Sequence, residues 1–497
     1  MTSRTDAETP GSDADHPNLK RVMGPGLLLL FVVGDILGTG VYALTGDVAA
    51  EVGGAAWVPF LVAFLIAAVT ACSYLELVTK YPQAAGAALY THKAFGVHFV
   101  TFLVAFIVMC SGITSASTAS RFFAANFFTA FHFSWGKAGV VVVALLFMAL
   151  LAVINFRGVG ESVKLNVVLT IIEITGLLLV IFVGLWAFTK GGENVDFSRV
   201  VAFDTPADKN VFLAVTTATS LAFFAMVGFE DSVNMAEETK DPVRVFPKVL
   251  LTGLSIAGVV YIGVAIVAVA LVPIGTLEAS DTPLVEVVKA GAPGLPIEQI
   301  LPFISMFAVS NTALINMLMA SRLIYGMSRQ HVLPRHLGVV HPVRRSPWVA
   351  IVFTTSIAFG LIFYVTAFAN STAIAVLGGT TSLLLLAVFA MVNVAVLVLR
   401  RDVREGRAKA SEPPGERGRA DQPVHFRTPT LFPIIGCLAS LYLVTPLSGR
   451  PVQQYVLSGV LIAIGIVLFF ITMAFNRQLG IKGAAITDLT HLGDAPD

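Results

Sequence analysis

Charged residues are scarce in this sequence of 497 residues. Asp, Glu, Lys and Arg make up 13% of it, about half the share of an average soluble protein, while 56% is hydrophobic. The 32 Lys and Arg nearly balance the 31 Asp and Glu, so the chain has no overall basic field of the kind that attracts nucleic acid. This composition excludes an ordinary soluble protein and argues against nucleic-acid binding.

Cysteine is scarce too, and histidine is not grouped. The three cysteines, Cys72, Cys110 and Cys437, lie in apolar runs without CxxC or Cys/His spacing, so the sequence predicts neither a metal site nor a disulfide framework. No HExxH or GxSxG motif occurs, and the nine histidines fall in predicted loops, tails or span ends. These absences argue against an intramembrane enzyme, the alternative from another functional class, and no cofactor is predicted.

Long apolar runs are abundant instead. A helix needs roughly 20 apolar residues to cross a bilayer, because every backbone amide must be satisfied within its own segment. The sequence predicts an all-α, multi-pass membrane protein with both termini in the cytoplasm, since most Lys and Arg then fall in cytoplasmic loops. Twelve spans are expected near 24–50, 55–79, 95–130, 138–156, 162–189, 211–235, 247–274, 297–327, 347–368, 372–399, 429–447 and 453–476.

Three segments lack such runs. Residues 1–22 are polar and predict a disordered cytoplasmic tail, and residues 477–497 predict a second tail. Residues 401–428, rich in Arg, Glu, Pro and Gly, predict a flexible cytoplasmic loop, with a lipid or partner site as the alternative. Between them lie a predicted core over 23–400 and two further helices within 429–476. The plasma membrane is the expected location.

Two spans carry helix-breaking residues at mid-membrane depth. Gly38 and Gly40 flank Thr39 in the first span, and Gly228 precedes Glu230 in the sixth. Glycine favours unwinding, and unwound backbone in a membrane is tolerated only where it lines a cavity. A packing face of small residues is the alternative for the glycines. Two interrupted helices, five spans apart, are typical of an inverted-repeat transporter, with repeats here of about 24–189 and 211–399.

Three segments resemble the amino acid, polyamine and organocation transporter superfamily. Gly34 to Tyr42 matches the first-span pattern G-x-I-[IL]-G-[ST]-G-[IV]-[FY] of that family, Phe224 to Pro247 resembles its sixth span and the loop after it, and Ala320 to Pro334 resembles its eighth span ending. The resemblance implies the leucine-transporter fold, with ten core helices in a 5+5 inverted repeat, two further helices, and discontinuous spans one and six. It also implies a permease that works by alternating access, proton-coupled by preference, with exchange without ion coupling as the alternative.

The resemblance further implies where the substrate binds. Amides of the first break and the Thr39 hydroxyl would hold a carboxylate, and carbonyls of both breaks would hold an amino group. Phe224 matches the aromatic that closes over the substrate as a gate, with a core or lipid-facing role as the alternative. A cationic amino acid or amine and a neutral amino acid both stay open as substrates. The predicted substrate-binding residues are Asp35, Ile36, Gly38, Thr39, Gly40, Phe224, Ala225 and Val227.

Acids within the spans are the candidates for proton coupling. Asp35 stands where relatives usually carry a small or amide residue, and it could bind a cation, carry a proton or cap the unwound backbone. Glu173 aligns with a lysine that replaces a sodium ion in some relatives, with a structural hydrogen bond as its alternative role. Glu230 matches an acid linked to pH response. Ser310 and Thr312 could complete a sodium site against the first span, although proton coupling is preferred.

Overall fold

The computed structural model describes most of the chain. The described residues are 23–82, 86–157, 162–191, 195–236, 239–294, 296–329, 333–344, 346–368, 373–404 and 425–478. Within these ranges the chain is helical and contains no β-strand, only isolated bridges. The tail predicted at 1–22, most of the tail predicted at 477–497, and residues 369–372, where the ninth predicted span gives way to the tenth, lie outside the described residues.

Twelve apolar helical segments confirm the predicted membrane architecture. Eleven are long and apolar enough to cross a bilayer, and α16 is shorter. In chain order the spans are α1 with α2 (Pro25–Ile36 and Thr39–Val52), α3 (Trp57–Lys80), α5 (His98–Phe131), α6 (Gly136–Arg157), α7 (Ser162–Lys190), α9 with η1 and η2 (Val211–Ala222, Phe223–Met226 and Asp231–Met235), α10 (Pro242–Leu271), α13 (Ile297–Arg329), α14 (Trp348–Phe368), α15 (Ala373–Arg404), α16 (Leu431–Val444) and α17 (Val452–Gln478).

The eleventh span is shorter than the stretch 429–447 that the sequence predicts. Its helix ends at Val444, and the short 3-10 turn η4 (Pro446–Ser448) follows. Pro446 has no amide hydrogen and cannot continue the hydrogen-bonding pattern of the helix. Hydropathy alone does not register this end, because no charged residue occurs on either side of it up to Gly449.

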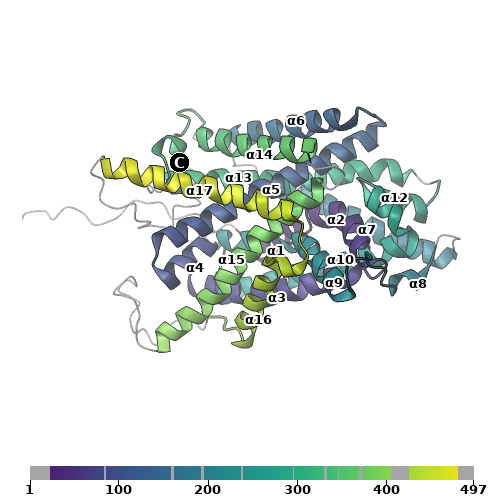
Figure 1. The fold of residues 1–497 in the computed structure, drawn as a ribbon, viewed down its shortest axis with the longest axis horizontal. Helices are drawn as coiled ribbons and strands as arrows, with labels where there is room; N and C mark the ends of the chain where they lie inside the picture. Colours follow the sequence, from purple (N-terminus) through teal and green to yellow (C-terminus); the bar gives the residue numbers. More distant parts are fainter. Residues whose placement is uncertain are drawn as a thin grey trace, which may run out of the picture.

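Five short helices between the spans are absent from the sequence prediction, which considered only long apolar runs. They are α4 (Gly86–Phe95), α8 (Phe197–Val200), α11 (Ile274–Ala279), α12 (Pro283–Gly291) and η3 (Arg335–Gly338). An interrupted span, a long span, short helical structure and three further spans follow one another twice along the chain. Helices α4 and α12 hold equivalent places in these two runs, yet they lie at opposite ends of the molecule (Figure 1), as an inverted repeat requires.

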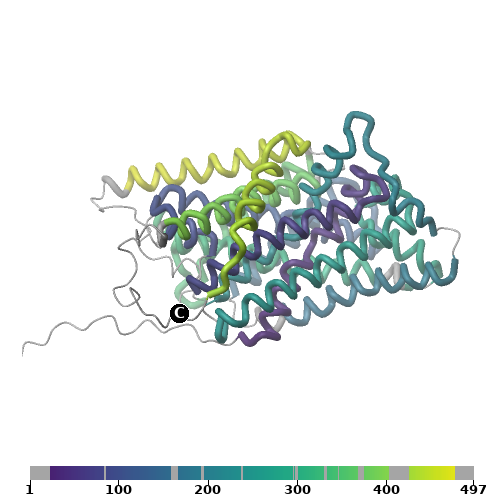
Figure 2. Tube along the Cα trace, turned by 90° about the horizontal axis from the view of Figure 1, so that it is seen from below, coloured from purple at the N-terminus to yellow at the C-terminus, as the bar shows by residue number. Residues whose placement is uncertain are grey.

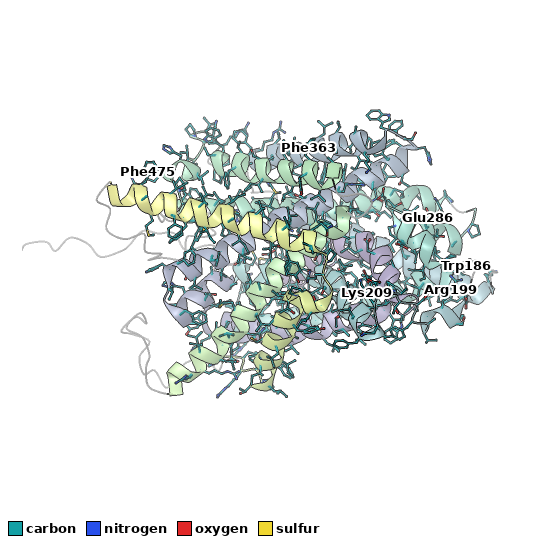
Figure 3. All side chains as sticks on the ribbon, viewed as in Figure 1. Trp186, Arg199, Lys209, Glu286, Phe363 and Phe475 are labelled. Carbon is teal, nitrogen blue, oxygen red and sulfur yellow. The ribbon has the colours of Figure 1, made fainter. Side chains whose placement is uncertain are left out.

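The long spans run side by side along the molecule, with α17 at its outer edge (Figure 2). In the most apolar 18-residue stretch of each span, 83% of the residues are buried for α1 with α2, but 33% for α17. Large apolar side chains such as Phe363 and Phe475 stand exposed on the outer helices (Figure 3). These faces suit contact with lipid, and the first span lies at the centre.

One end of the molecule carries charged and interfacial side chains. Figure 3 places Trp186, Arg199 and Glu286 at this end, with Lys209 further toward the middle of the molecule. The Nζ of Lys190 lies 4.9 Å from the centre of the Trp186 ring, and Lys209 Nζ lies 2.6 Å from Glu51 Oε2. Tryptophan and lysine are typical of the membrane–water interface, so this end is where α7 leaves the apolar layer.

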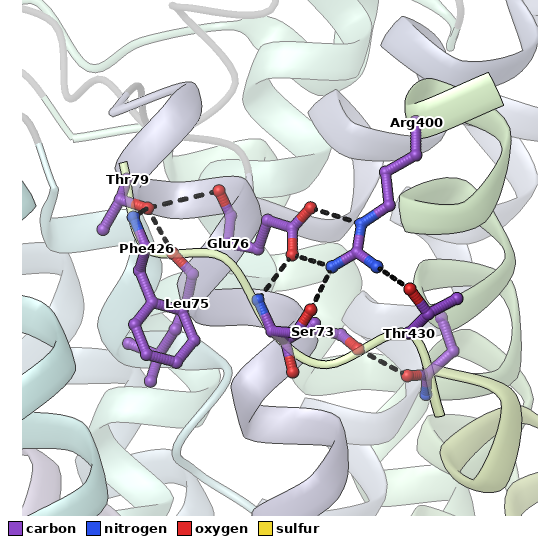
Figure 4. Close-up of polar contacts among 9 residues, drawn as sticks. Ser73, Leu75, Glu76, Thr79, Arg400, Phe426 and Thr430 are labelled. Carbon is purple, nitrogen blue, oxygen red and sulfur yellow. Dashed lines mark hydrogen bonds and ion pairs between the residues drawn. The ribbon is translucent and has the colours of Figure 1, made fainter. Parts of the chain in front are cut away.

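The opposite end holds a buried ion pair. Arg400 of α15 contacts both carboxyl oxygens of Glu76 in α3, and its Nε donates to Glu76 Oε1 at 2.8 Å (Figure 4). The Thr428 amide donates to Glu76 Oε2 at 2.9 Å, and the Phe426 amide donates to Thr79 Oγ1 at 3.1 Å. Helix α15 continues to Arg404 and Thr428 is buried, so both ends of the stretch 401–428 are ordered where the sequence predicts a loop.

Candidate functional site

The first span is interrupted between Leu37 and Gly38. Helix α1 ends at Ile36, Gly38 has non-helical backbone angles (φ −50°, ψ −150°), and α2 starts at Thr39. No side chain caps the first turn of α2, so its first amide N–H groups have no partner from within the helix. These amides carry the positive end of the helix dipole, which favours a carboxylate.

The glycines of the first span allow neighbouring elements to approach closely. A Cβ atom at Gly40 would overlap the backbone of Ala225, and one at Gly38 would overlap the hydroxyl of Thr312. The first clash is with backbone, which cannot move aside, and the second is with the end of a side chain. The break is therefore in direct contact with the sixth span and with α13.

The sixth span unwinds over a longer stretch. Helix α9 ends at Ala222, the 3-10 turn η1 follows, Val227 is extended, and Gly228 has a positive φ of 122°. This angle favours glycine, and a Cβ atom at Gly228 would lie 2.6 Å from the Asp35 carbonyl oxygen. The Gly228 amide donates to Glu230 Oε2 at 2.9 Å. The second break thus faces the end of α1 and supplies its own cap.

The two breaks enclose a cavity with an empty volume of about 280 Å³. It brings together seven of the eight predicted substrate-binding residues, together with Thr312. The lining residues are Asp35, Ile36, Gly38, Thr39, Gly40, Ser115, Phe224, Val227, Gly228, Asp231, Thr312 and Asn316. Ala225 is the one predicted substrate-binding residue that is not in this lining, although its backbone lies against Gly40.

Several polar atoms of this cavity are buried without a hydrogen-bond partner among the described residues. They include the hydroxyls of Thr39 and Thr312 and the Oδ2 atom of Asp35. Buried polar atoms normally have partners, because leaving one unsatisfied costs about 1–3 kcal/mol. The lining described here contains no Lys, Arg or His. A ligand with one carboxylate and one ammonium group would satisfy both ends of the cavity.

The match to known proteins agrees with this geometry. The profile of the family described as amino acid permease matches residues 28–475. The chain belongs to the amino acid permease family. It is therefore a multi-pass membrane protein of a transporter family, and the resemblance seen in its sequence motifs is confirmed.

Individual relatives of this permease carry different substrate names. It is 30% identical to the chloroplastic cationic amino acid transporter 9 of Arabidopsis thaliana over 356 residues, which cover 68% of this chain and 60% of that protein. It is 24% identical to the branched-chain amino acid permease BcaP of Bacillus subtilis over 93% of this chain and 95% of that one. The methylthioribose transporter of Bacillus subtilis is 26% identical over 93% of this chain and 96% of its own length.

Glu173 of the permease lies behind the first break. It is fully buried in α7, and neither carboxyl oxygen has a hydrogen-bond partner in the part of the chain that the structure describes. The Tyr42 hydroxyl donates to its backbone carbonyl at 3.1 Å, and the Tyr261 hydroxyl donates to the Ile36 carbonyl. An unpaired carboxylate at this depth would cost several kcal/mol, so the group requires a proton or a cation.

The remaining coupling candidates occupy different places. Glu230 caps the second break and does not line the central cavity. Ser310, expected to face the first span, is not brought to the cavity. Its hydroxyl donates to the Met306 carbonyl of its own helix at 2.6 Å. Thr312, two residues further along α13, does line the cavity.

Sequence reasoning did not place Ser115 or Asp231 in the site. Ser115 lies in a run of small polar residues in α5, and that run was the available signal, since such residues mark close helix contacts. Asp231 follows Glu230 directly, and the relation between the two acids depends on the 3-10 geometry of the break. Asp231 lines the central cavity and a neighbouring cavity, whereas Glu230 lines only the neighbouring one. An α-helical projection of the sequence does not predict this difference.

Proposed function

We propose that this permease moves amino acids across the plasma membrane by alternating access, with a proton as the coupled ion. Residues 24–189 and 211–399 form its two inverted repeats, 429–476 add two further helices, and both termini lie in the cytoplasm. The two broken helices rearrange about the central cavity, and Phe224 closes over the substrate.

One observation carries this proposal: an uncapped helix N-terminus and two carboxyl groups, Asp35 and Asp231, line the same central cavity. The free amides at the start of α2 and the unpartnered Thr39 hydroxyl suit an α-carboxylate. Asp35 and Asp231, with the carbonyls of Ile36, Phe224, Ala225 and Val227, suit an α-ammonium group. The Ile36 carbonyl already accepts from Tyr261 and has one lone pair left.

The side chain of the substrate is less constrained than its charged ends. The relatives are named for cationic amino acids, branched-chain amino acids and methylthioribose. Asp35 and Asp231 give the cavity two carboxyl groups, one more than an α-ammonium group requires, which favours a cationic amino acid or amine over a neutral one. We therefore propose a basic amino acid as the first substrate to test.

The test is uptake of radiolabelled amino acids by proteoliposomes that contain the purified permease. The wild type should accumulate its substrate, and Gly38→Val should abolish uptake because the added side chain occupies the space beside Thr312. Normal uptake by this variant, in protein correctly inserted in the membrane, would exclude the proposed site. Gly24→Val is a matched control, because nothing lies within 4 Å of a Cβ atom at Gly24.

Coupling is tested in the same vesicles. We expect an imposed proton gradient to drive accumulation, and Glu173→Gln to flatten the pH dependence, since this buried carboxyl has no other partner among the described residues. An unchanged pH profile would return Glu173 to a structural role. Uptake that persists after the gradient is collapsed, but requires amino acid inside the vesicle, would identify an exchanger without ion coupling.

A further inference from the structure

A second cavity lies next to the central one and shares one wall with it. Its empty volume is about 360 Å³, and Asp231 lines both spaces. It is bounded by α3, α4, α5, α13 and the second break. The lining residues are Tyr74, Ala87, Ala88, Ala105, Val108, Glu230, Asp231, Asn234 and Leu323. We call this space the inner chamber.

The inner chamber lies toward the α4 end of the molecule. Val108 precedes Ser115, which lines the central cavity, by seven residues on the same helix, and this corresponds to about 10 Å along its axis. A group that leaves the central cavity past Asp231 would therefore enter the inner chamber one or two helical turns further on.

The polar side chains of the inner chamber offer acceptor oxygens, and no basic side chain is described beside them. Glu230 and Asp231 supply two carboxyl groups, and Asn234 supplies an amide. Among the residues that line it and are described, none is Lys, Arg or His. No ion pair or hydrogen bond to the Asp231 carboxyl is found within the described ranges. Carboxyl groups buried in an apolar space need a proton or a positively charged partner, so this space favours a cationic ligand.

Tyr74 provides an independent indication of a ligand. Its side chain is 1% exposed and lines the chamber, and its hydroxyl has no hydrogen-bond partner among the described residues. Glu230 lines the same chamber. Buried tyrosine hydroxyls usually find a partner, so this one is available to a ligand.

The remaining walls decide which cation fits. Ala87, Ala88, Ala105, Val108 and Leu323 are apolar and cover most of the chamber. A calcium ion takes six to eight oxygen ligands and magnesium six in a strict octahedron. The lining offers at most that number, and Glu230 Oε2 already accepts from the Gly228 amide, so these ions are poorly matched. An alkylammonium ion matches it better, because its three N–H donors meet the carboxyl, amide and phenol oxygens while its carbon chain contacts the apolar wall.

We propose that the inner chamber is a second binding site, specific for an alkylammonium group. Asp231 passes this group from the central cavity to Glu230, Asn234 and Tyr74. This proposal rests on the proposed function in one respect. The alkylammonium group is taken to be the ammonium end of an amino acid that leaves the central cavity. The chamber itself requires no carboxylate on its ligand.

The test is equilibrium binding to the full-length permease in nanodiscs, with 1,5-diaminopentane as the probe. The wild type should bind this diamine saturably. Ala88→Leu fills the chamber and should weaken diamine binding on the order of tenfold or more, while amino acid binding in the central cavity persists. Tyr74→Phe should weaken it about threefold to tenfold, since it removes one hydrogen bond to a charged group.

Tyr90→Phe is the matched control. The Tyr90 hydroxyl is also buried and without a described partner, and its ring contacts that of Tyr74, but Tyr90 does not line the chamber. Its removal should leave diamine binding unchanged. If Ala88→Leu also loses amino acid binding, the variant is misfolded and is not informative. The comparison of Tyr74→Phe with Tyr90→Phe then tests by itself whether the diamine binds in the inner chamber.

Three results would overturn the proposal. They are absence of diamine binding to the wild type, equal effects of the two tyrosine variants, and displacement of the diamine by sodium chloride but not by potassium chloride, which would indicate a sodium site. Failure of the proposed function looks different. Diamine binding that responds to Tyr74→Phe, in a protein that neither binds nor takes up amino acids, would retain the chamber and remove the amino acid substrate.

Discussion

The two helix breaks differ in how they satisfy their own backbone. The first is confined to Leu37 and Gly38, and the helix that follows starts without a side-chain cap. The second extends over residues 223–235, contains two 3-10 turns and binds its own Gly228 amide through Glu230. One break leaves donors free, and the other uses its donors internally.

This difference assigns opposite chemistry to the two sides of the cavity. Free amides of α2 stand on one side, whereas carbonyls and acids of α1 and the sixth span stand on the other. A transporter that carries zwitterions requires such polarity, because the two ends of its substrate have opposite charge. The following substitutions are designed to remove the asymmetry or to measure it.

The largest effect is expected where the breaks touch. Gly40→Val places its Cβ inside the backbone of Ala225, so the breaks must separate, and transport should be abolished. The measurement is uptake in proteoliposomes. Gly26→Val is the control, since Gly26 lies in α1 with nothing within 4 Å of its added Cβ atom. Wild-type uptake by Gly40→Val would show that the contact between the breaks is not required.

A smaller loss is expected from one hydroxyl of the first break. Thr39→Val removes the unpartnered hydroxyl at nearly constant volume and should weaken substrate binding about tenfold. Thr45→Val is the matched control, because the Thr45 hydroxyl donates to Val41 of the same helix. Binding isotherms measure both. Equal losses would mean that the effect arises from helix stability and not from the substrate.

The contact between the first break and α13 can be measured separately. The atoms nearest to a Cβ atom at Gly38 all belong to the Thr312 side chain, and its hydroxyl is the closest, so Gly38→Ala should lower affinity severalfold and Thr312→Ala should restore most of it. A double-mutant cycle on substrate binding should give a coupling energy of about 1 kcal/mol. Strict additivity would contradict the contact between these two residues.

The smallest effect is expected at the second break. Glu230→Ala removes the cap on the Gly228 amide and should lower stability by about 1 kcal/mol, as measured by thermal unfolding in detergent. Glu230→Gln keeps an acceptor oxygen and should retain most of this stability. If Gln destabilises as much as Ala, the charge of Glu230 and not its hydrogen bond stabilises the break.

More of the fold than of the candidate site could be predicted from the sequence. Twelve spans and the two interruptions follow from apolar length and from the positions of Gly38 and Gly228, because bilayer thickness and backbone satisfaction leave few alternatives. The short helices and the early end of α16 did not follow, since they depend on local capping and on Pro446.

The structure brings the predicted residues of the two breaks to one cavity, apart from Ala225, whereas the positions of side chains that depend on helix rotation did not follow from the sequence. Thr312 faces the cavity and Ser310 bonds within its helix, although both are small hydroxyl residues in one span. Asp231 lines two cavities and begins the 3-10 turn η2, and α-helical periodicity does not predict where side chains point in such a turn.

The network around Glu76 and Arg400 has a consequence for engineering the chain. Arg400 and residues 426–428 are held at the same carboxyl group, so the two ends of the intervening stretch are fixed close together by α3 and not by the length of that stretch. Loop-closure entropy grows slowly, by about 0.6 kcal/mol for each doubling of loop length. A fluorescent domain inserted within 405–424 should therefore report on the permease without altering the spacing of its spans.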